Sequence, residues 1–200
     1  MIAVLDYGIG NLRSAEKALQ RVGGDAHLIT DPADATEATG IVLPGVGAFG
    51  RCMLALRATG LDRVALDAVT AGTPFLGICV GMQMLYDGSD EDPAVSGLGV
   101  LAGKIRLLPD GVKRPQMQWN RLDAVVRDSP MLAGLGEGPW LYFVHSYAPE
   151  LSDDVVATCD YGGPVVAAAA RDGVWATQFH PEKSGPAGLR LLANFVAACD

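Results

Sequence analysis

The 200-residue sequence lacks the features that mark several common classes of protein. No apolar run approaches the roughly 20 residues of a membrane span, so we expect no membrane partner. The opening residues, MIAVLDYGIGNLRS, lack the basic start and cleavage site of a secretory signal, which predicts a cytoplasmic protein. Lysine and arginine number 15 against 23 acidic residues and form no cluster, which disfavours nucleic-acid binding. The formal net charge of −8 then serves solubility.

Cysteine is scarce as well, and its spacing excludes the usual structural roles. The four cysteines form no CxxC pair and have no zinc-ligand spacing to the three histidines, so we predict no metal site and no cofactor. In a reducing cytoplasm a disulfide framework is not expected either. Three of them lie among apolar or small residues and are predicted to be buried, inert thiols: Cys52, Cys159 and Cys199. Cys79 differs, because a glycine lies two residues away on each side.

The pattern of apolar residues predicts an α/β protein. In the first half, strand-like segments (IAVL, AHLI, GIVLPG, PFLGIC) alternate with helical patterns that begin after Asn11, near Arg51 and at Val80. Such alternation is typical of a mainly parallel central sheet flanked by helices. In the second half, strand-like runs separated by short turns predict added antiparallel strands, followed by a last helix over 189–199. We find no interdomain linker and expect a single domain over residues 1–200.

The stretch PFLGICVGMQ has the pattern of a nucleophile elbow. A strand ending in G-x-nucleophile-x-G turns at once into a helix, and Gly77 and Gly81 remove side chains where the two elements approach. This turn exposes the Cys79 thiol at the carboxyl edge of the sheet. The start of the helix also favours the thiolate form. Cys79 is therefore a candidate nucleophile.

A thiol nucleophile needs a base and a group that orients the base. His180 ends the strand-like run VWATQF, and Pro181 restricts it to extended conformations. Because residues i and i+2 of an extended segment face the same side, Glu182 can orient the imidazole. His27 is interpreted as structural or exposed, and His145 as either a core residue or part of the site.

An oxyanion hole is predicted beside Cys79. One N–H would come from Val80, immediately after the nucleophile. The second would come from LPGVGAF, where Gly45 and Gly47 leave backbone N–H groups accessible. Phosphate binding by this loop is the alternative, but no Walker lysine follows it.

The motifs GICVGMQ, PGVGAF and QFHPEKS together resemble the class I (triad) glutamine amidotransferase family. The segments LDYGIGNLRS, PQMQWNRL and LYFVHSYAP narrow the resemblance to the glutaminase subunits of imidazole glycerol phosphate synthase, an enzyme of histidine biosynthesis. The similarity extends from Asp6 to Ser184. Two positions depart from the subfamily pattern, because Gln118 replaces a glycine and Val80 replaces a leucine.

The resemblance implies a glutaminase with L-glutamine as substrate. Cys79 would attack the side-chain amide to form a γ-glutamyl thioester, with His180 as base and then acid and Glu182 orienting it. The resemblance also implies an oxyanion hole formed by Val80 and by Val46 and Gly47 of the oxyanion loop. The residues that it places around the glutamine are Gln83, Glu91, Ser146 and Tyr147.

The resemblance also implies a protein partner. Ammonia would pass to a (β/α)8-barrel cyclase subunit, which forms imidazole glycerol phosphate and AICAR. The interface positions that carry over are Trp119, Asn120, Tyr142 and Lys183. Two alternatives remain open at this point, the glutaminase of another class I amidotransferase and a catalytically silent binding subunit.

Overall fold

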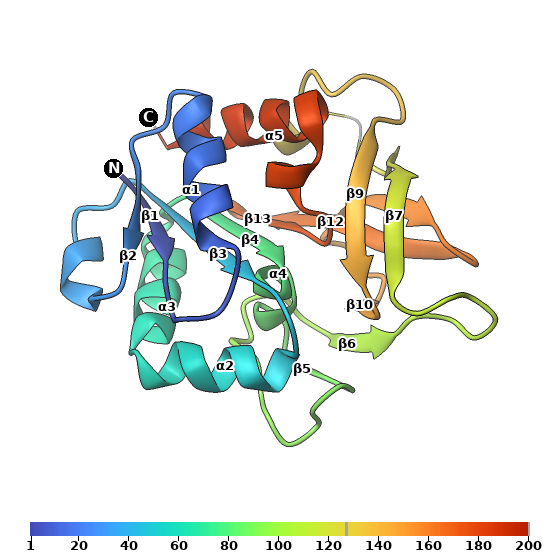
Figure 1. The fold of residues 1–200 in the computed structure, drawn as a ribbon, viewed down its shortest axis with the longest axis horizontal. Coiled ribbons are helices and arrows are strands. Elements are labelled where there is room, and N and C mark those ends of the chain that lie inside the picture. Colours follow the sequence, from blue (N-terminus) through green and yellow to red (C-terminus); the bar gives the residue numbers. More distant parts are fainter. Residues whose placement is uncertain (127, 200) are drawn as a thin grey trace.

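The computed structural model describes residues 1–126 and 128–199, and its centre is an open, twisted sheet (Figure 1). Within those residues the sheet has eight strands in the order β2-β1-β3-β4-β13-β12-β11-β8. From β2 to β13 all neighbours are parallel, and β12, β11 and β8 add antiparallel pairs at one side. The predicted fold class is therefore confirmed. The strands are β1 (Ile2–Leu5), β2 (Ala26–Ile29), β3 (Gly40–Gly45), β4 (Phe75–Cys79), β8 (Asp123–Ala124), β11 (Val155–Asp160), β12 (Pro164–Arg171) and β13 (Val174–Thr177).

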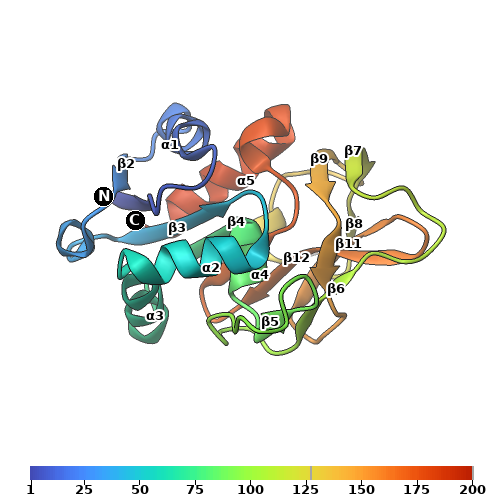
Figure 2. The ribbon, with the colours of Figure 1, turned by 60° about the horizontal axis from the view of Figure 1, so that its bottom comes forward.

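Helices cover both faces of this sheet. The helices α1 (Leu12–Arg21) and α5 (Gly185–Ala198) lie on one face, and α2 (Phe49–Ala58) and α3 (Leu61–Ala71) lie on the other (Figure 2). Every residue of β1, β3 and β4 is buried, which explains why these strands are continuous apolar runs rather than alternating ones. Within the described ranges, no helix has the length and apolar character needed to cross a bilayer.

Three details of these elements came only from the structure. Asn11 stands at the N-cap of α1, and its side-chain oxygen accepts from the Ser14 hydroxyl (2.8 Å) rather than from a backbone N–H. The strand β3 continues past Pro44, because Gly45 still pairs in register with Cys79. The last helix begins at Gly185 instead of 189, since a proline in its first turn fits the helical backbone.

Two small sheets extend the antiparallel side. One has the order β10-β6-β5, and the other pairs β7 with β9. Their bounds are β5 (Gly88–Ser89), β6 (Lys104–Leu107), β7 (Gln116–Arg121), β9 (Trp140–His145) and β10 (Tyr147–Pro149). The strand β7 was not predicted, because it is exposed along most of its length and lacks an apolar alternation. Its pairing with β9 holds it in place. Short 3-10 turns lie at Pro32–Ala35, Pro130–Leu132 and Pro181–Lys183.

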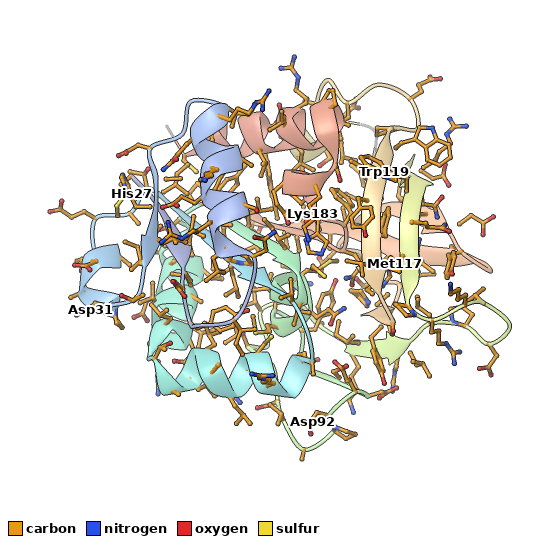
Figure 3. All side chains as sticks on the ribbon, in the orientation of Figure 1. His27, Asp31, Asp92, Met117, Trp119 and Lys183 are labelled. Carbon is orange, nitrogen blue, oxygen red and sulfur yellow. The ribbon has the colours of Figure 1, made fainter. Side chains whose placement is uncertain are left out.

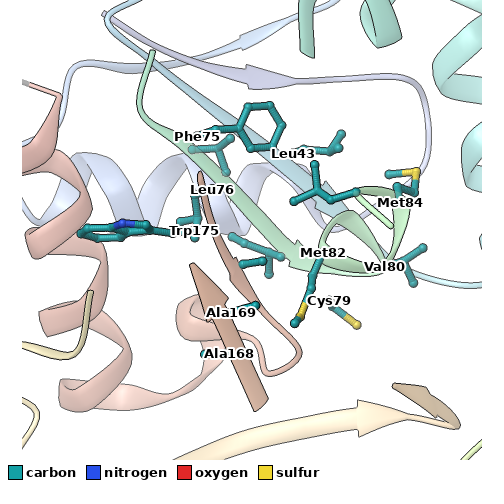
Figure 4. Packing of buried hydrophobic residues seen from close by; sticks show 14 of the residues in the cluster. Leu43, Phe75, Leu76, Cys79, Val80, Met82, Met84, Ala168, Ala169 and Trp175 are labelled. Carbon is teal, nitrogen blue, oxygen red and sulfur yellow. The ribbon is translucent and has the colours of Figure 1, made fainter. Parts of the chain in front are cut away.

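The carboxyl ends of β3 and β4 lie side by side at the middle of the sheet, at the edge of the hydrophobic core. Buried apolar side chains of β3, β4 and β13 pack around Phe75, Leu76 and Trp175, and Cys79 lies at the end of this cluster (Figure 4). Gly45 of β3 lies opposite Cys79 of β4. Because ligands of open parallel sheets bind beyond the carboxyl ends of the strands, this edge is where a site is expected.

Candidate active site

Cys79 occupies a strained turn between β4 and the short helix α4 (Val80–Met84). Its backbone has φ 57° and ψ −112°, a conformation that residues other than glycine rarely adopt. A Cβ on Gly81 would overlap the Leu43 carbonyl oxygen, and one on Gly77 would lie 3.0 Å from the Gly81 oxygen. The two glycines of the elbow are thus required by close packing of strand and helix.

The loop after β3 lies beside the elbow. A Cβ on Gly45 would lie only 2.7 Å from the Gly81 nitrogen, so this glycine serves the packing of β3 against α4. Gly47 has φ 93° and open space where a Cβ would be. The Tyr7 hydroxyl donates to the Pro44 carbonyl (2.7 Å), and the Cys52 thiol donates to the Val46 carbonyl (3.3 Å).

His180 and Glu182 form a buried pair at the end of β13. His180 Nδ1 and Glu182 Oε1 are 2.8 Å apart, and the two side chains are 2% and 4% exposed. The extended segment is held on both sides of the histidine, since His180 N–H donates to the Tyr142 carbonyl (3.0 Å) and the Ser184 hydroxyl donates to the His180 carbonyl (2.6 Å). The expectation that the two side chains face the same side agrees with this geometry.

The charge state of His180 depends on its neighbours. Burial by itself lowers the pKa of His180, but the Cys79 thiol and the Glu182 carboxylate outweigh it and raise the pKa to about 9. Nε2, the other ring nitrogen, is buried and has no hydrogen-bond partner among the described residues. A protonated imidazole beside Cys79 favours the thiolate, which is the nucleophilic form.

These residues open onto a cavity of about 260 Å³. Ten residues were expected in catalysis, the oxyanion hole or glutamine binding, and all of them except Glu182 line this cavity. Glu182 lies behind His180. The lining residues are Cys79, His180, Val46, Gly47, Val80, Gln83, Glu91, Ser146 and Tyr147, together with Pro115, Val144 and His145. A larger hollow of about 380 Å³ between Arg121 and Pro139 contains no part of this group. The chemistry therefore points to the smaller cavity.

The cavity presents fixed hydrogen-bond acceptors. Gln83 Nε2 donates to the Tyr147 carbonyl (2.9 Å) and to Gln178 Oε1 (3.0 Å), which leaves Gln83 Oε1 as the atom that can accept from a ligand. Glu91 Oε2 accepts from the Phe49 N–H (2.8 Å) at the start of α2. A carboxylate and an amide oxygen suit a ligand that carries an ammonium group.

Comparison with known proteins agrees with this arrangement. The sequence model of the family described as "Glutamine amidotransferase class-I" matches residues 3–199. The chain belongs to the class I glutamine amidotransferase family. It is therefore an enzyme that acts on the amide of glutamine.

Individual relatives and structures place this amidotransferase more closely. It is 50% identical to "Imidazole glycerol phosphate synthase subunit HisH" of Methanothermobacter thermautotrophicus, over 98% of each chain. It is 47% identical to the protein of the same name from Salinibacter ruber, over 98% of this chain and 94% of that one. A crystal structure of a glutamine amidotransferase, at 21% identity and 98% coverage of both chains, gives a TM-score of 0.77. "PurLQS from Thermotoga maritima" also gives 0.77 at 21% identity, over 98% and 97%. These structural likenesses show the fold.

Three of the four positions expected at a partner interface lie near one another at the surface of the amidotransferase: Trp119, Tyr142 and Lys183. Trp119 of β7 is 48% exposed and contacts Tyr142 of β9 edge to face, with ring centroids 6.0 Å apart. Lys183 is exposed near them, and Met117 lies on the same strand as Trp119 (Figure 3). Asn120 differs, because its Nδ2 donates to the Asp160 carbonyl (2.9 Å).

The structure shows the surroundings of two further positions of the amidotransferase, Gln118 and His145. Gln118 has no positive φ, so β7 accommodates a side chain where the subfamily has glycine. His145, left open above, is buried and lines the cavity. Its Nδ1 donates to the Tyr147 carbonyl (2.9 Å), and burial, with a smaller effect from His180, lowers its pKa to about 4. His145 is therefore neutral at pH 7, with Nε2 as an acceptor.

Gln178 is a site residue that the sequence analysis missed. Its Nε2 donates to Cys79 Sγ at 3.8 Å, and its side chain is fully buried. A signal existed, because Gln178 precedes His180 by two residues in an extended segment and therefore faces the same side. The sequence interpretation of His180 considered Glu182, two residues after it, and not Gln178, two residues before it.

Proposed function

We propose that this amidotransferase is the glutaminase subunit of an imidazole glycerol phosphate synthase in histidine biosynthesis, with the whole chain as one glutaminase domain. The observation that carries the proposal is the group of Cys79, His180 and Glu182 at one cavity, in a chain 50% identical over nearly its full length to a subunit of that synthase. The enzyme hydrolyses L-glutamine to glutamate and ammonia, and the ammonia passes to a cyclase subunit.

In the first half-reaction the Cys79 thiolate attacks the side-chain amide carbon of glutamine. The oxyanion that forms accepts from the Val80 N–H and from the loop of Val46 and Gly47. His180 then gives its proton to the amide nitrogen as the C–N bond breaks, which releases ammonia and leaves a γ-glutamyl thioester on Cys79.

In the second half-reaction a water molecule replaces the thiol. His180, now neutral, takes a proton from the water as its oxygen attacks the thioester carbon. The C–S bond breaks, glutamate leaves, and the thiolate and the imidazolium are restored. Glu182, 2.8 Å from Nδ1, stabilises the imidazolium in both half-reactions.

The α-carbon groups of glutamine bind at the other side of the cavity. Gln83 Oε1 and the Glu91 carboxylate accept hydrogen bonds from the α-ammonium group. The backbone of Ser146 and Tyr147 faces the α-carboxylate. The position of Glu91 supports this assignment, because its bond to the Phe49 N–H holds the carboxylate in the cavity wall.

The partner is a (β/α)8-barrel cyclase subunit that docks on the face of Trp119, Asn120, Tyr142 and Lys183. Support comes from the exposed Trp119 and Met117 side chains on β7, since surface aromatic and methionine residues are enriched at protein interfaces. The same face lies on strands β7 and β9, and β9 continues into the cavity wall at Val144 and His145. Docking at this face can therefore act on the site.

The test is glutamate release from L-glutamine by the purified chain, alone and mixed with the cyclase subunit and its substrate. We expect strong stimulation in the full mixture, loss of activity in Cys79→Ala, and retention in the matched Cys159→Ala. Equal activity in every mixture would indicate the glutaminase of another class I amidotransferase. Absence of activity in every mixture would indicate a silent binding subunit.

A further inference from the structure

Gln178 lies behind the nucleophile rather than in the cavity wall. It follows β13 directly, and its N–H donates to the Ala167 carbonyl (2.8 Å), which extends the pairing of β13 with β12. The side chain is 0% exposed and does not line the cavity. It contacts two groups, the Cys79 sulfur and the Gln83 amide.

The direction of the Gln178 amide follows from a fixed acceptor. The Tyr147 carbonyl can only accept, so the Gln83 group that faces it at 2.9 Å is the NH2. The same NH2 faces Gln178 at 3.0 Å, so the Gln178 atom there is the oxygen. The NH2 of Gln178 is then the group that faces Cys79 Sγ at 3.8 Å. The amide donors therefore lead to the sulfur, and in the thiol form the sulfur donates in turn to the Val144 carbonyl (3.9 Å), a bond that the thiolate cannot make.

This contact supplies what a thiolate in a buried elbow needs. A charged acceptor gains more from an N–H donor than a neutral thiol does, and the fixed amide limits the positions of the sulfur. We propose that Gln178 is a positioning residue that stabilises the Cys79 thiolate and holds its sulfur toward the cavity. Gln83 takes part through Gln178, because it fixes which end of the amide meets the sulfur. The proposal deepens the proposed function and rests on Cys79 being the nucleophile.

A purely structural role makes a different prediction. If Gln178 served only as an acceptor for Gln83, its loss would change packing and stability but would not change the reactivity of Cys79 with pH. The two roles are separated by a measurement on the thiol itself, without glutamine and without the partner.

The experiment is alkylation of the full chain by iodoacetamide, followed at Cys79 by peptide mass spectrometry at pH 7 and pH 10. The variant Gln178→Met keeps a side chain of similar size and removes the donor. The variant Gln178→Glu keeps the acceptor for Gln83 and places an oxygen against the sulfur. The buried thiols of Cys159 and Cys199 in the same samples serve as controls for local unfolding.

At pH 7 we expect Cys79 in Gln178→Met to react about tenfold more slowly than in the wild type, because a hydrogen bond to a charged group shifts an ionisation equilibrium by about that factor. Gln178→Glu should react at least as slowly. At pH 10 the difference in Gln178→Met should fall below about twofold, because hydroxide then removes the proton without help from Gln178. In the glutaminase assay kcat should fall about tenfold, with less than a threefold change in KM.

Equal rates for wild type and both variants at pH 7 would overturn the proposal. An equal decrease at pH 7 and pH 10 would also overturn it, since it would reflect access rather than ionisation. If Gln178→Met fails to fold, Gln178→Glu decides alone by the same comparison at pH 7. A wild type whose Cys79 reacts selectively but that releases no glutamate in any mixture would refute the proposed function and leave the positioning role intact.

Discussion

The elbow allows a sharp test through a single methyl group at Gly81. In Gly81→Ala the new Cβ would overlap the Leu43 carbonyl oxygen and lie 2.8 Å from its carbon and 3.3 Å from the Pro44 carbon. All three atoms belong to the backbone of β3, in the middle of the sheet, so no side chain can rotate away. Strand β3 and helix α4 would have to separate by more than about 1 Å, because carbon atoms pack at about 3.5–4.0 Å and the overlap with the oxygen is larger than that with either carbon.

The cost can be estimated from similar overpacking. Extra methyl groups in well-packed cores reduce the free energy of unfolding by about 1–3 kcal/mol when side chains can adjust. With backbone on both sides, we expect Gly81→Ala to lose about 3 kcal/mol or more. For a chain of this length each kcal/mol lowers Tm by about 2–4 °C, so Tm should fall by about 6–12 °C. Alkylation of Cys79 should also slow, since the elbow sets the position of its sulfur.

The matched control is Gly88→Ala, where the nearest atom to the new Cβ is the Val95 oxygen at 3.7 Å, an ordinary contact, and φ is not positive. Thermal unfolding followed by circular dichroism compares the two variants with the wild type. Gly88→Ala should stay within about 2 °C of the wild type. A Gly81→Ala protein that also stayed within 2 °C would refute the argument that this glycine is required by packing.

Three other expectations follow from the site and its neighbours. Glu182→Gln removes a negative charge that raises the pKa of His180. We therefore expect kcat to fall at least a hundredfold and the alkaline limb of the pH–rate profile to move to lower pH. An unmoved alkaline limb would contradict the pairing of His180 with Glu182. His145 has a pKa lowered from 6.5 to about 4, so its neutral form stabilises the fold above pH 6.5 and this stabilisation, about 3 kcal/mol, is lost as pH falls toward 4. Urea unfolding should show a smaller loss over this range in His145→Gln than in the wild type, and equal losses would show that His145 is not the group responsible. Trp119→Ala should weaken binding of the cyclase subunit at least tenfold in calorimetry, whereas Leu54→Ala should not, although Leu54 on α2 is exposed to a similar or greater extent. Equal Kd values for the two variants would exclude Trp119 from the interface.

Some elements could be found from sequence because their signal is local. The strands β1, β3 and β4 are apolar runs, and the break between α2 and α3 falls at Gly60, which has φ 75°. The strand β7 had no such signal, because most of its residues face solvent and its partner β9 lies about 20 residues further along. Pairing between distant segments replaces the hydrophobic alternation on which sequence prediction depends.

The residues of the site were likewise predictable where their signal is local and unpredictable where it depends on distant segments. The spacing of Gly77, Cys79 and Gly81, and of His180 and Glu182, placed a thiol and its base at strand ends, but spacing could not bring two segments about 100 residues apart to one cavity. Parallel pairing of β4 with β13 does that, because neighbouring strands of a parallel sheet end at the same edge.

The sequence by itself determined the class of fold and the residues with catalytic potential, because strand periodicity, glycine at a strained turn and proline after a histidine act over a few residues. Only the tertiary structure decided which polar groups meet. The contact of Gln178 with Cys79 and the bond of Gln83 to the Tyr147 carbonyl join residues 99 and 64 positions apart. Hydrogen bonds act over about 3 Å and depend on direction, so such contacts exist only once the sheet and its helices have packed.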